Sequence, residues 1–318
     1  MIASIIVDNL LTAPVIAFVV AGLATLVRAD IRLPEPLYAV LSSYLLLAIG
    51  IKGGRALGLS ESAELWRPLI AALALGIITP LLAFALLRRV GRLDTINAAA
   101  TAAHYGSVSA VTFTVALATL EASGQSVEGF LAGLLAVLEV VGIVVALALA
   151  RDRGSSDGWT EALLEVIRGR SITLLLGGLV IGLAVGDERL APTDPLFVSL
   201  FTGALTLFLV EMGVVAAERL RDARDAGWRI VVLGIVIPLA NGAIGAAAGS
   251  LAGLSTGGTA VLATLAASAS YIAAPAAVRI ALPSASPGLY VTASLGITFP
   301  FNVILGIPIY LAMAQVLT

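Results

Sequence analysis

Long apolar runs, separated by short polar links, dominate this chain. Ten of the runs are about 20 residues long, the length that an α-helix needs to cross the hydrocarbon core of a bilayer. The pattern predicts an all-α polytopic membrane protein with ten transmembrane helices. We place these helices at residues 10–28, 37–56, 68–90, 95–119, 128–150, 171–187, 195–217, 229–252, 259–281 and 288–314.

Short patterns recur between the two halves of the chain at offsets of about 160 residues. Gly-Ile-Ile-Thr-Pro at 76–80 is echoed by Gly-Ile-Val-Ile-Pro at 234–238, and Pro-Leu at 36–37 by Pro-Leu at 195–196. Because five is odd, two halves of five spans enter the membrane in opposite directions, as a 5+5 inverted-topology repeat. Chance similarity among apolar helices is the alternative. We expect one membrane domain with a first repeat at 1–150, a cytoplasmic connecting loop at 151–170 and a second repeat at 171–318.

Two polar, small-residue stretches interrupt the predicted fourth and ninth spans at matching places, residues 101–112 and 268–277. Gly106 weakens a helix and Pro275 removes a backbone donor, so we expect both helices to be broken there. Matched breaks in two halves point to a transport site, where helix N-termini face an anion and freed carbonyls face a cation. The candidate binding residues are Thr101, Tyr105, Gly106, Ser107, Ser109, Thr112, Ser268, Ser270, Tyr271 and Ala273.

A structural explanation of these stretches is the alternative. Ser and Thr hydroxyls can bond to their own helix, and small residues can allow close helix packing. The occurrence of two matched breaks favours the site.

The two interrupted spans contain no carboxylate. A proton-driven carrier usually has a titratable carboxylate near the membrane centre, and here only His104, the one histidine, is titratable near neutral pH. We therefore expect sodium as the coupling ion, bound by hydroxyls and backbone carbonyls near Ser107, Ser109 and Ser270.

Three charged residues lie within apolar spans and are possible accessory charges: Lys52, Glu139 and Glu211. Lys52 and Glu211 lie close to span ends, where a long side chain can reach the interface instead. Glu139 lies deepest in its span.

Composition agrees with a membrane protein and narrows its class. Hydrophobic residues make up 59% of the 318 residues and charged residues 12%, against about 25% in soluble domains, and the mean hydropathy is +1.06. The chain has no cysteine, hence no disulfide and no cysteine-based metal site. Without a metalloprotease or nucleotide-binding motif, we expect neither an enzyme nor a cofactor other than a coupling sodium ion.

Basic residues sort between the two faces that ten spans define. Fourteen arginines fall on one face and four basic residues on the other. By the positive-inside rule the first face is cytoplasmic, which predicts a plasma (inner) membrane protein with both termini outside. The four outer residues are Lys52, Arg55, Arg67 and Arg189.

Four segments, residues 46–54, 103–113, 268–279 and 294–308, resemble the sodium-dependent bicarbonate transporter family, the SbtA-type permeases. The resemblance extends over essentially the whole chain. It implies ten helices in two inverted halves, a homotrimer, and coupling of sodium influx to bicarbonate uptake. It also implies a substrate site between the broken helices, onto which Tyr105, Gly106, Ser107, Ser109, Ser268, Ser270 and Tyr271 fall.

Cyanobacterial members of this family are also regulated by a small PII-like protein that plugs the cytoplasmic side. The central connection of this chain looks short by comparison, which argues against such a partner.

The sequence therefore predicts a sodium-dependent symporter of a small inorganic anion, with bicarbonate as the first choice, working by alternating access. A sodium-coupled organic-anion carrier and a cation/proton antiporter of similar architecture are the alternatives within transport. A channel, and a non-transporting sensor that docks a partner through residues 151–170, are alternatives of other classes. We expect no nucleic-acid partner.

Overall fold

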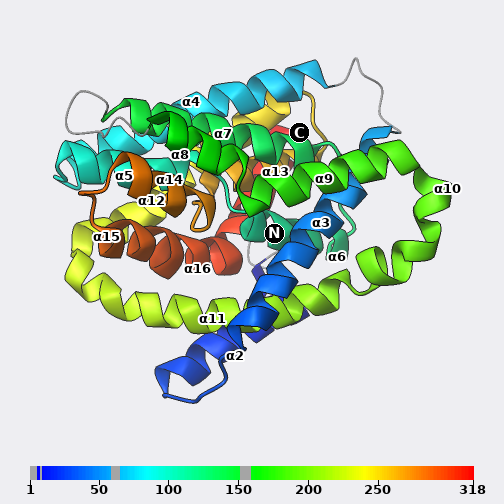
Figure 1. Ribbon diagram of the computed structural model, residues 1–318, viewed down its shortest axis with the longest axis horizontal. Coiled ribbons are helices and arrows are strands. Elements are labelled where there is room, and N and C mark those ends of the chain that lie inside the picture. Colours follow the sequence, from blue (N-terminus) through cyan, green and yellow to red (C-terminus); the bar gives the residue numbers. More distant parts are fainter. Residues whose placement is uncertain (1–5, 8, 59–64, 151–158) are drawn as a thin grey trace.

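The computed structural model describes residues 6–7, 9–58, 65–150 and 159–318, with the side chains of 159 and 222–225 left aside (Figure 1). These residues form helices and connecting segments, and the described part of the chain contains no strand. Seven helices within it are long and apolar enough to cross a membrane, or eight if the bent pair 160–167 and 170–185 forms one span.

The helices of the first half are α2 (Ala13–Leu26), α3 (Glu35–Gly58), α4 (Trp66–Arg89), α5 (Thr95–Gly106), α6 (Ala110–Ala122) and α7 (Leu131–Ala148). Those of the second half are α8 (Trp159–Ile167), α9 (Arg170–Val185), α10 (Asp187–Leu190), α11 (Phe201–Ala226), α12 (Trp228–Leu251), α13 (Thr256–Ala267), α14 (Ala273–Ala281), α15 (Pro287–Val291), α16 (Phe299–Phe301) and α17 (Ile307–Leu317). Short 3₁₀ and π segments complete them: η2 (Ala191–Thr193), η3 (Pro195–Ser199), η4 (Thr292–Thr298) and η5 (Asn302–Gly306).

Helical segments occupy all ten ranges predicted from the apolar runs, but three of them are short. The helices α2, α9 and α13 have 14, 16 and 12 residues, fewer than the roughly 20 that a straight span needs. This explains why seven or eight helices, rather than ten, meet the length and composition requirement. The ten-span count stays a prediction.

Glycines bring α3 and α9 into backbone contact. Gly50 and Gly54 on α3 face Gly178 and Gly182 on α9, with four-residue spacing on both helices. A Cβ atom at Gly54 would lie 2.1 Å from a carbonyl oxygen of α9. Small residues at this spacing let membrane helices approach closely and gain van der Waals contact.

A similar contact joins α2 to the long helix α11, and Figure 1 shows the dark-blue α2 beside it. A Cβ atom at Gly213 of α11 would lie 2.3 Å from the carbonyl oxygen of Phe18. Gly213 follows Gly54 by 159 residues, so close glycine contacts occur at corresponding places in both halves. We call α2, α3, α9 and α11 the glycine-packed group.

The helices α4 to α7 and α12 to α17 form a second group, the central group. Within it α4 packs on α5 and α7, while α12 packs on α13 and α17, and α4 also contacts α12. Pro80 inside α4 and Pro238 inside α12 are both buried. The interrupted segments lie within this group.

The predicted connecting loop at 151–170 is partly helical. Residues 151–158 lie outside the described part of the chain, but 159–167 form α8. Ala162 and Val166, one turn apart, are buried, and α8 packs against α14. The segment forms a helix because it has an amphipathic pattern, which the polar residues around it obscure.

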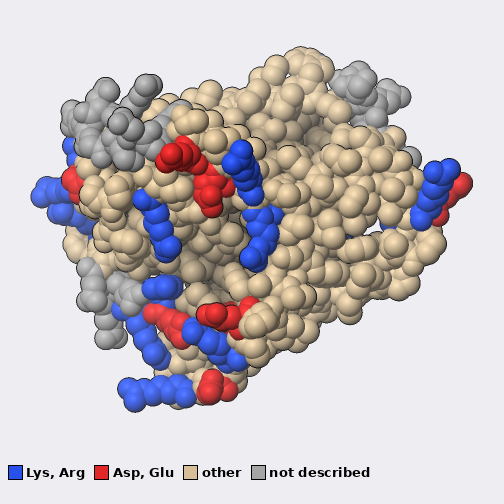
Figure 2. Space-filling model, viewed as in Figure 1, with Lys and Arg blue, Asp and Glu red and all other residues tan. Residues whose placement is uncertain are grey.

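Charged side chains are unevenly distributed over the surface. Figure 2 shows them gathered over the left half of one face, with a further group at the right edge beside α10 and uncharged surface between. Membrane-spanning helices need an uncharged surface where they contact lipid, and this wide uncharged region meets that need.

Neighbouring glycines of α9 give a test of the close contact with α3. A Cβ atom at Gly178 would lie 2.5 Å from the carbonyl oxygen of Leu47, whereas one at Gly177 has nothing within 4 Å. We expect Gly178→Ala to lower the free energy of unfolding by about 1–3 kcal/mol through overpacking. Gly177→Ala should raise it by about 0.5–1 kcal/mol, because alanine favours the helix. Unfolding in detergent measures both, and equal effects would contradict the contact.

Candidate functional site

Two non-helical segments lie in the middle of the central group. The helix α5 ends at Gly106 and α6 begins at Ala110, so residues 107–109 lie between two helices. Likewise α13 ends at Ala267 and α14 begins at Ala273. We call residues 107–109 and 268–272 the two interruptions.

The interruptions are hydrogen-bonded across the central group. The backbone N–H of Ser270 donates to the carbonyl oxygen of His104 at 2.8 Å, and the N–H of Ser109 donates to Ser268 Oγ at 2.9 Å. Unpaired backbone groups are costly in an apolar surrounding, so these two bonds stabilise both interruptions together. Segments 159–166 residues apart in sequence are thus in direct contact.

Gly106 is required by packing. A Cβ atom there would lie 2.7 Å from Pro80 Cβ and 2.8 Å from the carbonyl oxygen of Gly142, and one on Gly142 would lie 1.7 Å from the Gly106 oxygen. Positive φ angles among described glycines occur elsewhere in the chain. Close approach of α5 to α4 and α7, rather than backbone freedom, therefore explains this glycine.

Pro275 lies inside α14 and not at the interruption. It is the third residue of this helix, whose first turn needs no proline N–H. In a continuous helix the N–H of residue 275 would bond to the Tyr271 carbonyl, and proline has no such N–H, so the place of Pro275 just after residues 268–272 is compatible with the predicted break.

Several predicted site hydroxyls are engaged in capping. Ser109 Oγ accepts the N–H of Thr112 at 3.1 Å at the start of α6, and Ser270 Oγ accepts the N–H of Ala274 at 3.3 Å. Ser268 Oγ donates to the carbonyl oxygen of Leu265 at 2.8 Å. Ser109 and Ser270 thus serve as acceptors in these bonds.

Thr101 and Ala273 contribute less to a site. Thr101 Oγ1 donates at 2.8 Å to the carbonyl oxygen of Asn97 in its own helix. Ala273 offers only its backbone, as the first residue of α14.

Ser107 Oγ and the Tyr271 hydroxyl are buried and have no hydrogen-bond partner among the described residues. Ser107 is 0% exposed, and it directly follows the last residue of α5. Buried polar atoms without a partner are uncommon in folded proteins. These two groups give the interruptions unused hydrogen-bonding capacity.

The imidazole ring of His104 is held by contacts with its own helix and with Tyr290. Nδ1 lies 2.8 Å from the carbonyl oxygen of Ala100, and the ring stacks on Tyr290 with centroids 4.5 Å apart. Its Nε2 atom is buried without a partner among the described residues.

Tyr105 lies in a hydrogen-bonded chain that joins three elements of the central group. Thr298 Oγ1 in η4 donates to the carbonyl oxygen of Gly234 in α12 at 2.7 Å, so the Tyr105 hydroxyl, 2.8 Å away, donates to Thr298. Tyr105 is 1% exposed. The geometry gives it a role in fixing α5.

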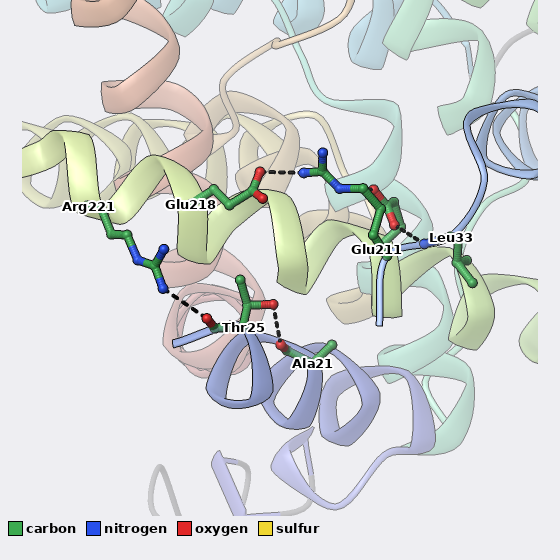
Figure 3. Close-up of polar contacts among 7 residues, drawn as sticks. Ala21, Thr25, Leu33, Glu211, Glu218 and Arg221 are labelled. Atoms are coloured by element: carbon green, nitrogen blue, oxygen red, sulfur yellow. Dashed lines mark hydrogen bonds and ion pairs between the residues drawn. The ribbon is translucent and has the colours of Figure 1, made fainter. Parts of the chain in front are cut away.

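The three accessory charges lie in different environments. Glu139 on α7 is buried, and its Oε2 has no partner among the described residues. Glu211 accepts the N–H of Leu33 at 2.8 Å and lies 3.7 Å from Arg32, which also bonds to Glu218 (Figure 3). Glu211 therefore helps to fix the connection between α2 and α3 onto α11.

Asn302, which contacts the end of α13, and Asn241 of α12 are buried polar residues that the sequence reading missed. Asn302 Nδ2 donates to the carbonyl oxygen of Ala267 at 2.9 Å, at the end of α13, and Asn302 Oδ1 accepts the hydroxyl of Tyr310 at 2.8 Å. Both amide atoms of Asn241 are buried without a partner among the described residues. An asparagine inside an apolar span is costly in lipid, and that signal would have singled out both.

A double-mutant cycle tests the role of Tyr105. Thr298→Val leaves the buried Tyr105 hydroxyl and the Gly234 carbonyl without this partner, which should cost about 1–3 kcal/mol of unfolding free energy. Tyr105→Phe should cost about 1 kcal/mol in the native protein and much less in the Thr298→Val background. Thermal unfolding of the four proteins measures the coupling, and additive effects would contradict the chain of bonds.

Comparison with known proteins gives a family. A comparison with curated protein sequences finds no match. The chain does match the sequence profile of a transporter family over residues 14–315, a range that includes both helix groups and both interruptions. Such proteins are permeases and not enzymes, which agrees with the several apolar helices of a multi-pass membrane protein. This protein belongs to the Na⁺-dependent bicarbonate transporter superfamily.

Proposed function

We propose that the protein carries bicarbonate into the cell together with sodium, at a site formed by the two interruptions. The observation that carries this proposal is a pair of buried hydroxyls, Ser107 and Tyr271, that have no hydrogen-bond partner in the described part of the chain and lie in segments that contact each other. Family membership supports both the anion and the coupling ion.

The anion is held by helix N-termini and hydroxyl donors. The first N–H groups of α6 and α14 have no acceptor within their own helices, and each N-terminus carries about half a positive charge. Ser107, Ser109 and Ser270 supply hydroxyl protons that bond to bicarbonate oxygens. A single negative charge is thus bound without a basic side chain in the interruptions.

Sodium binds beside the anion, to oxygen atoms only. Hard cations prefer such ligands, and the carbonyl groups at the ends of α5 and α13 together with the same serine hydroxyls provide them. The two opposite charges reduce each other's cost of leaving water. Joint binding therefore favours closure of the site, which couples the two movements. No further cofactor is proposed.

The proposed architecture is a 5+5 inverted repeat of ten spans, interrupted in the fourth and ninth. Support comes from helix pairs that correspond between the two halves. The contact of α2 with α11 corresponds to that of α9 with α3, and the contact of α4 with α5 corresponds to that of α12 with α13. Alternating access then takes place by movement of the glycine-packed group against the central group. The charge bias places both termini outside the cell.

Trimer formation is proposed from the family resemblance alone. Regulation by a PII-like protein is not proposed for this chain, and α8 occupies part of the connection where such a partner would act.

Uptake into proteoliposomes tests the function. An inward sodium gradient should drive accumulation of radiolabelled bicarbonate, and choline in place of sodium should abolish it. Equal uptake with choline would contradict the proposal. Competition by organic anions would favour a sodium-coupled organic-anion carrier. Proton efflux driven by sodium, without bicarbonate uptake, would favour a cation/proton antiporter. Uptake that saturates at low turnover would distinguish a carrier from a channel.

Ser107→Ala tests the site. The loss of one hydrogen bond to a charged ligand weakens the binding free energy by about 1.5 kcal/mol or more. We therefore expect KM for bicarbonate to rise about tenfold, while the variant still folds. Thr206→Ala is the matched control, because the Thr206 hydroxyl donates to the carbonyl oxygen of Thr202 in its own helix. Equal KM values for the two variants would move the site elsewhere.

A further inference from the structure

A cavity of about 250 Å³ lies where the two helix groups meet. The glycine-packed group contributes Lys52 of α3 and Phe201 of α11 to its wall, and the central group contributes Phe113 and Glu121 of α6. Residues of α7 and of the connection before it complete the lining. Since both groups line it, movement of one group against the other changes its size.

Lys52 is the only lysine of the chain and is weakly paired in this cavity. Its Nζ atom lies 3.9 Å from Glu121 Oε2 and 4.8 Å from the ring centroid of Phe201. The Glu121 side chain is 70% exposed, so solvent screens this ion pair and the pair contributes little. The ammonium group thus keeps most of its capacity to bind an anion.

The second carboxylate of the cavity is already taken. Glu128 accepts the backbone N–H of Ser255 at 2.7 Å and the Ser255 hydroxyl at 3.1 Å. It joins the connection between α6 and α7 to the start of α13. The rest of the wall is largely apolar, with Ile49, Phe113 and Leu117 among its residues.

One face of α6 connects the cavity to the interruptions. Ser109, Phe113, Leu117 and Glu121 follow one another at four-residue intervals, so they lie along one side of the helix. Leu117 and Glu121 line the cavity, and Ser109 precedes the first residue of the helix. Phe113, which is 1% exposed, lies between the cavity and Ser109, one turn of about 6 Å from that serine.

We propose that this cavity is a second anion site, in which Lys52 binds bicarbonate on its way to the interruptions. The arriving anion takes the place of Glu121 as the counter-ion of the ammonium group, and Phe113 separates this site from the inner one. Lys52 is among the few basic residues on the face that the charge bias assigns to the outside. The inference rests on the proposed function, because it names a further site for the same substrate.

Kinetics of charge variants give the first test. Lys52→Met should raise KM for external bicarbonate about tenfold with the maximal rate kept within about twofold, and Lys52→Arg should stay near the native KM. Glu121→Gln should lower KM, because it removes the competing carboxylate, and a purely structural role of Lys52 would not produce that effect. Arg189→Met, which removes an exposed cation of α10, is the matched control. Native KM in Lys52→Met would overturn the proposal.

Acylation of Lys52 by a membrane-impermeant amine reagent gives a second test that needs no transport. Bicarbonate should slow the acylation several-fold at constant pH and ionic strength, because a bound anion keeps the amine protonated and covered, while the bulky anion gluconate should not. Peptide mass spectrometry separates Lys52 from the terminal amine. Normal sodium-driven uptake with no protection would overturn this site alone. Protection without sodium-driven uptake would support it and contradict the proposed coupling.

Discussion

Backbone polar groups in the centre of an apolar protein need partners, and everything near the site depends on how the two interruptions meet this need. The Ser270 N–H donates to the His104 carbonyl oxygen near the end of α5, and the Ser109 N–H donates to the Ser268 hydroxyl. Asn302 adds a side-chain amide for the last carbonyl of α13. Among the described residues the same arrangement leaves the buried Ser107 and Tyr271 hydroxyls without a hydrogen-bond partner.

Close glycine contacts occur within each of the two helix groups and between them. In the glycine-packed group, backbones touch through Gly54 and Gly213, and in the central group Gly106 touches Gly142. Interfaces of this kind tolerate no added methyl group and little sliding. Tight contacts also cross the boundary between the groups, where a Cβ atom at Gly53 of α3 would lie 2.7 Å from Ala132 Cβ of α7. The cavity around Lys52 lies at the same boundary, so close packing and open space occur side by side there.

Much of the helical plan follows from sequence, because an apolar run of sufficient length has few other stable forms in lipid. The positions of the two polar stretches were also readable, since hydroxyls and small residues stand out in apolar runs. Side-chain partners were not. Tyr105 bonds to Thr298, 193 residues away, and Gly106 is fixed by a neighbour on α7, and neither relation leaves a local pattern. The amphipathic helix α8 was missed because charged residues beside it suggested a loop.

The pairing of α2 with α11 bears on how the protein is made. Gly22 and Gly213 are 191 residues apart, so at about 5–20 residues per second the ribosome finishes α11 roughly ten to forty seconds after α2. During that interval the 14-residue α2 lacks the helix on which it packs. The final packing of α2 therefore has to wait for the second half of the chain.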